Sequence, residues 1–151
     1  MKNNYLFFTI TAFFIFITDQ IIKSVFVGGF DWQSSCISLE LHYNNGVAFS
    51  MLAFLGENLK WLQLVLICVL IFFMIKDGYL EKYSIPAGIL VGAAFGNLSD
   101  RFVYGGVVDY VAWHCGFDFA VFNFADVMID FAIGWFLIYE FWLKPKRDDC
   151  R

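Results

Sequence analysis

The sequence predicts an all-α membrane protein in which residues 1–151 form a single domain with four transmembrane helices. Hydrophobic residues occupy 60% of the 151 positions and charged residues only 16%, a balance typical of membrane proteins rather than of soluble domains. The charges are clustered and leave apolar runs close to the length of a membrane-spanning helix. We place the spans at about residues 5–22, 60–75, 85–102 and 122–143.

The first run follows a short polar start that contains Lys2, as the apolar core of a signal peptide would. No small-residue cleavage site follows it, and apolar residues resume at Ile21 and Ile22, so we expect an uncleaved transmembrane helix. Asp19 and Lys23 lie four residues apart near its far end and share a helix face. This spacing is equally consistent with a structural ion pair and with a functional pair.

Residues 23–59 are expected to lie outside the bilayer. Apolar and polar residues alternate over residues 37–43, which predicts a strand with one covered face. The Asn-Asn-Gly of residues 44–46 is a turn signal. Residues 47–55 are apolar but too few to cross the membrane, so we expect them to lie at its surface or to pack under the strand.

The third run carries small residues, among them Gly88, Gly92 and Gly96. Small residues let another helix approach the backbone closely. The sequence leaves open whether the neighbour is a second span or a bound peptide.

The distribution of Lys and Arg sets the orientation of the spans, because cytoplasmic loops carry the excess of basic residues. Both termini are then cytoplasmic, and residues 23–59 and 103–121 are exoplasmic. The basic residues on the cytoplasmic side are Lys2, Lys76, Lys82, Lys144, Lys146, Arg147 and Arg151, against Lys23, Lys60 and Arg101 on the other side.

With this topology several polar side chains gather at the exoplasmic ends of the helices. Asp109 lies in an irregular, Gly-containing segment, and Asp126 lies about one turn into the last helix. Ionisable groups at membrane depth are costly and usually mark a site. The sequence therefore predicts a site at this end, and its polar members are Asp19, Asn97, Arg101, Asp109, Asn123 and Asp126.

Two neighbouring carboxyls suit acid-base hydrolysis of a peptide bond. They cannot both ionise cheaply, so one keeps its proton as an acid while the other serves as a base. This chemistry needs neither a metal nor a cofactor. The chain has no GxSxG or HExxH motif, and His42 and His114 lack an obvious nucleophile partner. It also has no basic patch of the kind that binds nucleic acid.

Five short motifs follow one another along the chain in a fixed order, and together they resemble those of lipoprotein signal peptidase, the bacterial signal peptidase II family. Each motif alone is weak, but the set covers nearly the whole chain. The motifs are DQxxK at residues 19–23, NxGxAF at 44–49, GNxxDR at 96–101, GxVVDY at 105–110 and FNxAD at 122–126.

The resemblance implies a four-helix membrane bundle with a small exoplasmic β-cradle and a short surface helix. It also implies an aspartyl endopeptidase of the bacterial inner membrane. Such an enzyme removes the signal peptide from a prolipoprotein by cutting just before the cysteine that carries a diacylglyceryl group. The expected partners are lipid-modified prolipoproteins and membrane lipids, and we expect a monomer without a cofactor.

The same resemblance assigns roles to individual residues. It implies that Asp109 and Asp126 are the catalytic pair. The supporting residues it implies are Asn97, Arg101 and Asn123, with Asn44, Gly46, Ala48 and Phe49 in an outer flap and Asp19 and Lys23 as structural or substrate-positioning residues.

The chain departs from the family pattern at one aromatic position, Tyr110, and at one acidic position, Asp130. Tyr110 stands where the family usually has Phe, and we expect it to pack in the same way. Asp130 lies one helical turn deeper than Asp126, and we hypothesise that it is neutral and hydrogen-bonded.

The cysteines show no CxxC spacing and no metal-binding pattern. Cys36 and Cys115 are both expected on the exoplasmic side, where they could pair, whereas Cys68 lies in a span and Cys150 in the cytoplasmic tail. Free thiols are the default prediction.

Two other functions compete with hydrolysis by a carboxyl pair. A small proton-coupled transporter also carries carboxyls within the membrane, but here they cluster at one face, and the span between Lys60 and Lys76 has none. A metal-dependent lipid-headgroup transferase would use the carboxylates as magnesium ligands and would be inactivated by chelators. Its ligands would be Asp100, Asp109, Asp118 and Asp126.

Overall fold

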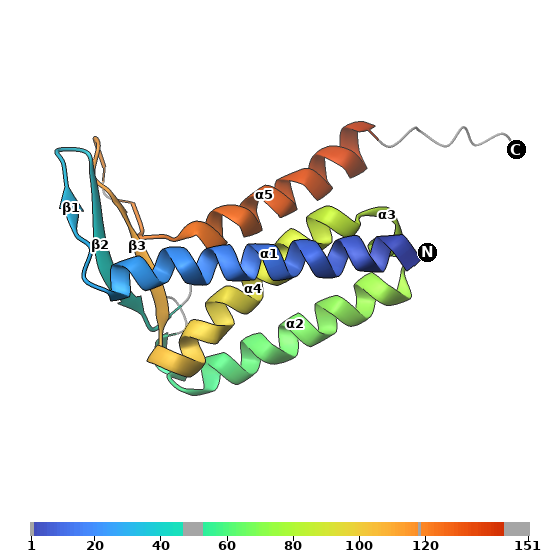
Figure 1. The fold of residues 1–151 in the computed structure, drawn as a ribbon, viewed down its shortest axis with the longest axis horizontal. Coiled ribbons are helices and arrows are strands. Elements are labelled where there is room, and N and C mark those ends of the chain that lie inside the picture. Colours follow the sequence, from blue (N-terminus) through green and yellow to red (C-terminus); the bar gives the residue numbers. More distant parts are fainter. Residues whose placement is uncertain (1, 47–52, 118, 144–151) are drawn as a thin grey trace, which may run out of the picture.

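The computed structural model describes residues 2–46, 53–117 and 119–143. Its helices run roughly lengthwise, and a small sheet lies across one end, opposite the N-terminus (Figure 1). The long helices are α1 (Lys2–Val27), α2 (Asn58–Lys76), α4 (Ser84–Tyr104) and α5 (Phe124–Ile138), which continues as a π-helical turn at Tyr139–Leu143; shorter pieces are α3 (Tyr79–Lys82) and a 3-10 turn at Ala53–Leu55.

The four long helices coincide with the four predicted spans. Among the described residues, α1 from Asn3 onward and α2 are long and apolar enough to cross a membrane. Helix α4 carries polar residues in its last two turns, and the α-helical part of α5 has only 15 residues, two of them acidic. The assignment of α4 and α5 as transmembrane helices therefore stays a prediction.

Helix α1 covers the small-residue face of α4. A Cβ atom at Gly88 would lie 2.7 Å from the backbone oxygen of Phe8, and one at Gly92 would collide with the backbone oxygen of Ala12. Only glycine allows this approach, because any side chain would push the helices apart. The neighbour that the sequence left open at this face is thus a helix of the chain itself.

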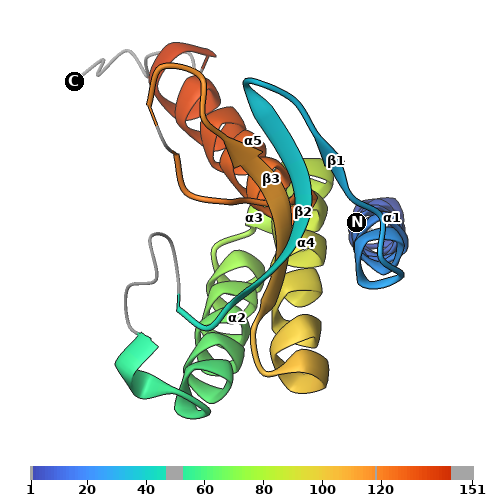
Figure 2. The same cartoon turned by 90° about the vertical axis from the view of Figure 1, so that its left-hand side faces the viewer.

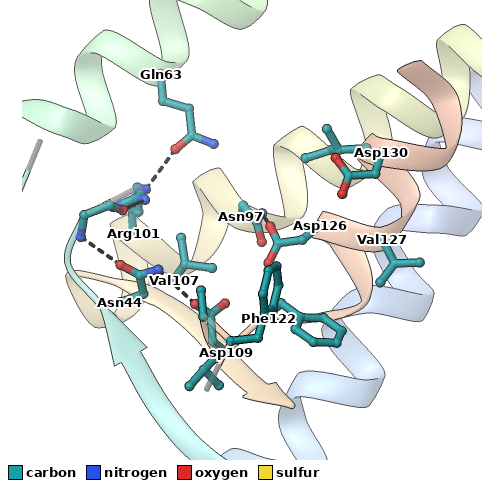
Figure 3. Close-up of a pocket in the computed structure, with 15 residues that line it drawn as sticks. Asn44, Gln63, Asn97, Arg101, Val107, Asp109, Phe122, Asp126, Val127 and Asp130 are labelled. Carbon is teal, nitrogen blue, oxygen red and sulfur yellow. Dashed lines mark hydrogen bonds between the residues drawn. The ribbon is translucent and has the colours of Figure 1, made fainter. Parts of the chain in front are cut away.

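Helices α2 and α5 lie on either side of α4, on the side away from α1 (Figure 2). Both pack against α4. Near the end remote from the sheet, Leu80 and Ala87 belong to an apolar cluster that also contacts Phe136 of α5. At the sheet end α2 and α5 stand apart, and the polar residues of α4 lie between them (Figure 3).

The sheet has three antiparallel strands in the order β1-β2-β3: β1 (Trp32–Gln33), β2 (Ile37–Asn44) and β3 (Val107–Trp113). Strand β2 confirms the strand predicted from alternation. The irregular segment predicted around Asp109 is wrong, since Asp109 lies on β3 opposite His42 of β2. Strand β3 is buried over most of its length, so its apolar residues do not alternate with polar ones.

The sheet is closed by a disulfide between Cys36 and Cys115, whose Cα atoms are 4.5 Å apart. The prediction of free thiols is wrong for this pair. Ile37 pairs with Trp113 in the β2–β3 register. The start of β2 and the end of β3 are therefore adjacent, and this places Cys36 and Cys115 next to each other. Cys68 is a free thiol on an exposed part of α2, and Cys150 lies outside the described residues.

Candidate active site

A cavity of about 610 Å³ opens at the sheet end of the bundle. Its walls come from α2, α4 and α5, from strands β2 and β3, and from the segment that leads into α5 (Figure 3). Of the residues predicted for the site and described in the structure, the following line it: Asn44, Gly46, Asn97, Arg101, Asp109 and Asp126.

Strand β3 carries Asp109 into this cavity while burying most of its side chain. The Asn44 Nδ2 atom donates a hydrogen bond of 3.0 Å to Asp109 Oδ2, and Asn123 Nδ2 donates one of 2.6 Å to Asp109 Oδ1. Both carboxyl oxygens therefore accept from an amide. This pairing offsets part of the cost of burying the group.

Asp126 is fixed by the start of α5. Asn123 is the N-cap residue, and its Oδ1 atom accepts from the Asp126 backbone N–H at 3.0 Å. In return, Asp126 Oδ2 accepts from the Asn123 backbone N–H at 3.1 Å, which completes a capping box. Asn97 Nδ2 of α4 donates to the other oxygen, Asp126 Oδ1, at 2.8 Å.

Asn123 thus joins the two carboxyls. Its side chain donates to Asp109 and caps the helix on which Asp126 lies, and it also donates to Asn97 Oδ1 at 3.1 Å. One amide holds a strand and two helices in register around the cavity. Figure 3 shows Asp109 and Asp126 approaching the same space from β3 and α5.

Burial raises the pKa of the Asp109 carboxyl to about 6, because the charged form loses hydration, and the nearby Asp126 charge adds to the rise. The hydrogen bonds from Asn44 and Asn123 act in the opposite direction. A carboxyl with this pKa can hold or release a proton near neutral pH, which is the property that general acid-base chemistry requires.

Lys23 forms a buried cluster behind the cavity. Its Nζ atom lies 2.8 Å from Asp19 Oδ2 and 2.7 Å from Asp100 Oδ2, and it donates to Asn97 Oδ1 at 2.8 Å. Asp19 and Lys23 therefore form the ion pair that their four-residue spacing predicted. The cluster also orients Asn97, whose side chain donates a hydrogen bond to Asp126.

Asp100 connects this cluster to the sheet. Besides Lys23, it accepts from Gln20 Nε2 at 3.1 Å and from the backbone N–H of Val108 at 3.1 Å. Val108 precedes Asp109, so this contact fixes the position of β3, and with it Asp109, relative to α4.

Arg101 links three parts of the structure. Its Nε atom donates to Gln63 Oε1 of α2 at 2.9 Å, and its guanidinium also donates to the carbonyl of Gly46. The Gly46 backbone N–H donates to Asn44 Oδ1 at 3.0 Å, which confirms the turn predicted after β2. Ala48 and Phe49, the other predicted flap residues, lie outside the described residues.

Gln63 is a cavity residue that the sequence did not reveal. It is the only amide or charged side chain between Lys60 and Lys76 of α2, and that is its only sequence signal. Phe119 and Phe122 also line the cavity. Their rings do pack edge to face, with centroids 6.1 Å apart.

Tyr110 packs as expected and gains a contact. Its ring stacks on Phe26 of α1 with centroids 4.0 Å apart. Its hydroxyl oxygen also accepts a hydrogen bond of 3.0 Å from the backbone N–H of Phe124, the first residue of α5. The hydroxyl thus helps to cap the helix that carries Asp126.

The chain matches the model of a known protein family over most of its length. The model described as signal peptidase (SPase) II matches residues 11–142. This chain belongs to the signal peptidase II family. The resemblance drawn from the five motifs is confirmed.

Relatives in the signal peptidase II family are similar over nearly their whole length. The lipoprotein signal peptidase of a Sulfurovum species is 57% identical over 139 residues, which are 92% of this chain and 95% of that one. The lipoprotein signal peptidase of Sulfurimonas denitrificans is 60% identical over 134 residues, or 87% of this chain and 84% of that one.

Two solved structures share the fold. A bacterial membrane enzyme determined by the in meso method at 2.3 Å resolution aligns with a TM-score of 0.78 at 24% identity, covering 94% of this chain and 92% of the other. A second, at 1.9 Å resolution, aligns with a TM-score of 0.73 at 25% identity, covering 88% and 91%. This signal peptidase II chain thus has the fold of a membrane enzyme.

Proposed function

We propose that this chain is an integral-membrane aspartyl endopeptidase that removes the signal peptide from bacterial prolipoproteins, cutting just before the lipid-modified cysteine. Family membership supports the reaction, and the printed names of the relatives support lipoproteins as substrates. The observation that carries the aspartyl mechanism is that Asp109 and Asp126 line one cavity and are joined by Asn123.

In the proposed mechanism the two carboxyls share one proton. The ionised carboxyl takes a proton from water as the water oxygen bonds to the scissile carbonyl carbon. The protonated carboxyl then gives its proton to the amide nitrogen as the carbon–nitrogen bond breaks. The products are the carboxylic acid of the signal peptide and the free amine of the lipid-modified cysteine.

The other predicted residues are proposed to support this pair. Asn97 and Asn123 orient the carboxyls through the hydrogen bonds described above. Asn44, Gly46 and Arg101 hold the end of β2 beside the cavity. Ala48 and Phe49 are proposed as part of the flap, and Asp19 and Lys23 as structural.

We also propose that α1, α2, α4 and α5 all cross the bacterial inner membrane, with both termini cytoplasmic and the sheet exoplasmic. The distribution of Lys and Arg supports this orientation. We also expect the protein to act as a monomer among membrane lipids.

The proposed function is tested with two forms of one precursor, one carrying a diacylglyceryl group on its cysteine and one without it. Purified protein should cleave only the modified form, and EDTA should leave the rate unchanged, since a carboxyl pair needs no metal. Loss of activity in EDTA would instead favour the metal-dependent transferase chemistry. Equal cleavage of both precursors would contradict the proposed specificity for lipid.

The pH dependence of cleavage should move upward in Asn44→Ala. Asn44 donates to Asp109 and favours its charged form, so deleting the donor raises the pKa of Asp109 further above its usual range. Activity requires one proton in the pair, and both limbs of the kcat/KM profile should therefore shift to higher pH, by about half to one unit.

The matched control for this shift is Asn45→Ala, which removes the neighbouring amide and leaves the Asn44 contact to Asp109 in place. Its pH profile should coincide with that of the unmodified chain. A downward shift in Asn44→Ala, or equal shifts in both variants, would show that Asn44 does not act through the Asp109 carboxylate.

A further inference from the structure

Asp130 is a third carboxyl in the wall of the cavity. It lies four residues after Asp126 on α5, so both point from one face of the helix, about 6 Å apart along its axis. Figure 3 shows Asp130 beside the cavity, further along α5 from the sheet than Asp126. Its side chain is exposed.

The hydrogen bond hypothesised for Asp130 is not found, because no other described residue forms a hydrogen bond or ion pair with it. Val127 and Ile129, which line the same part of the wall, are apolar. The two buried cations nearby are engaged elsewhere, Lys23 with Asp19 and Asp100 and Arg101 with Gln63.

A carboxyl in a membrane span persists where it is paired or faces a cavity that water can enter, and such a residue marks a functional site. Asp130 lines the cavity and is exposed, and no described residue binds it, so its carboxyl is available to a polar group that enters the cavity. On the proposed function, that group belongs to the prolipoprotein. The scissile bond lies at Asp109 and Asp126, and the membrane-embedded signal peptide extends from it along α5, away from the sheet.

The chemistry of the substrate indicates which of its groups can donate a hydrogen bond to Asp130. A diacylglyceryl group attached to sulfur has two ester groups, and it has no N–H or O–H with which to donate to a carboxylate. The peptide does have donors. A distance of about 6 Å corresponds to two residues of extended chain or four residues of helix, which places the donor two to four residues before the cleavage site.

We propose that Asp130 is a specificity-determining residue that accepts a hydrogen bond from a Ser or Thr hydroxyl located two to four residues before the scissile bond. This inference rests on the proposed function. It adds to the catalytic pair a contact that selects among prolipoproteins by the polarity of the last turn of their signal peptides.

The test compares diacylglyceryl-modified precursors that differ only by Ser or Ala at one of these positions. The ratio of kcat/KM for Ser over Ala should be about five- to tenfold in the wild-type enzyme, as for one typical hydrogen bond. Asp130→Val should bring the ratio to about one. Asp130→Asn, which keeps an acceptor oxygen, should retain an intermediate ratio.

The matched control is Phe131→Leu, a change at the next position of α5 that does not line the cavity. It should preserve the Ser preference. A ratio near one in the unmodified chain at every tested position, or a ratio that survives in Asp130→Val, would overturn the inference. Failure of the proposed function would give a different result, because the wild-type enzyme would then cleave neither the Ser nor the Ala precursor.

Discussion

Asp109→Asn and Asp126→Asn should each lower kcat for cleavage of a diacylglyceryl-modified precursor by about 10³-fold or more. Each change removes either the base that activates water or the acid that protonates the leaving nitrogen. The two carboxyls act as a unit, so the double variant should be no slower than the slower single variant. Single-turnover cleavage measured with purified protein gives this comparison directly.

The control for these variants is Asp31→Asn, which removes an exposed carboxyl from outside the cavity and should leave kcat within a factor of two. Thermal unfolding of all variants verifies that the fold is kept. If either Asn variant retained more than a tenth of the activity while folded, the aspartyl mechanism proposed for this pair would be wrong.

Lys23→Met should destabilise the whole bundle. The Lys23 ammonium is shared by the buried carboxyls of Asp19 and Asp100, and its removal leaves both without their cation. Breaking a buried ion pair in this way costs about 3–5 kcal/mol, which corresponds to a fall in melting temperature of roughly 10 °C. Because Lys23 also orients Asn97, activity should fall along with stability.

Lys60→Met is the matched control, since Lys60 forms an ion pair with a largely exposed Glu57. Exposed pairs contribute little, and the melting temperature should change by no more than about 2 °C. Adding Asp19→Asn to Lys23→Met removes one of the stranded charges and should recover part of the loss. Equal effects of Lys23→Met and Lys60→Met would show that the buried cluster does not stabilise the fold.

The sequence predicted much of the fold because the apolar runs and one strand carry clear periodic signals. Strand β2 was found from alternation, whereas β3 was missed because its residues are mostly buried and show no alternation. The sequence also placed Asp109 and Asp126 at one end of the bundle. It could not show that Asn123 joins them, because that contact depends on the register of β3 against α5.

Other features depend on which surfaces meet, and sequence patterns do not show this. The glycines of α4 indicated a close neighbour, but only the structure shows that α1 occupies the face. Gln63 gave no motif, since its role comes from the hydrogen bond that it accepts from Arg101 of the neighbouring helix α4. The pairing of Cys36 with Cys115 follows from the β2–β3 register, which was unknown while β3 was unrecognised.

The bridge between Cys36 and Cys115 has a consequence for how the protein matures in the cell. Such bonds form and persist in oxidising compartments and are rare in the reducing cytosol. The disulfide therefore supports the proposed exoplasmic placement of the sheet on grounds unrelated to Lys and Arg. With that placement, the strands that hold Asn44 and Asp109 are covalently joined only after they leave the cytoplasm. Cells that lack thiol oxidation in the envelope should accumulate this chain with an unclosed sheet, and hence with its carboxyl pair incompletely assembled.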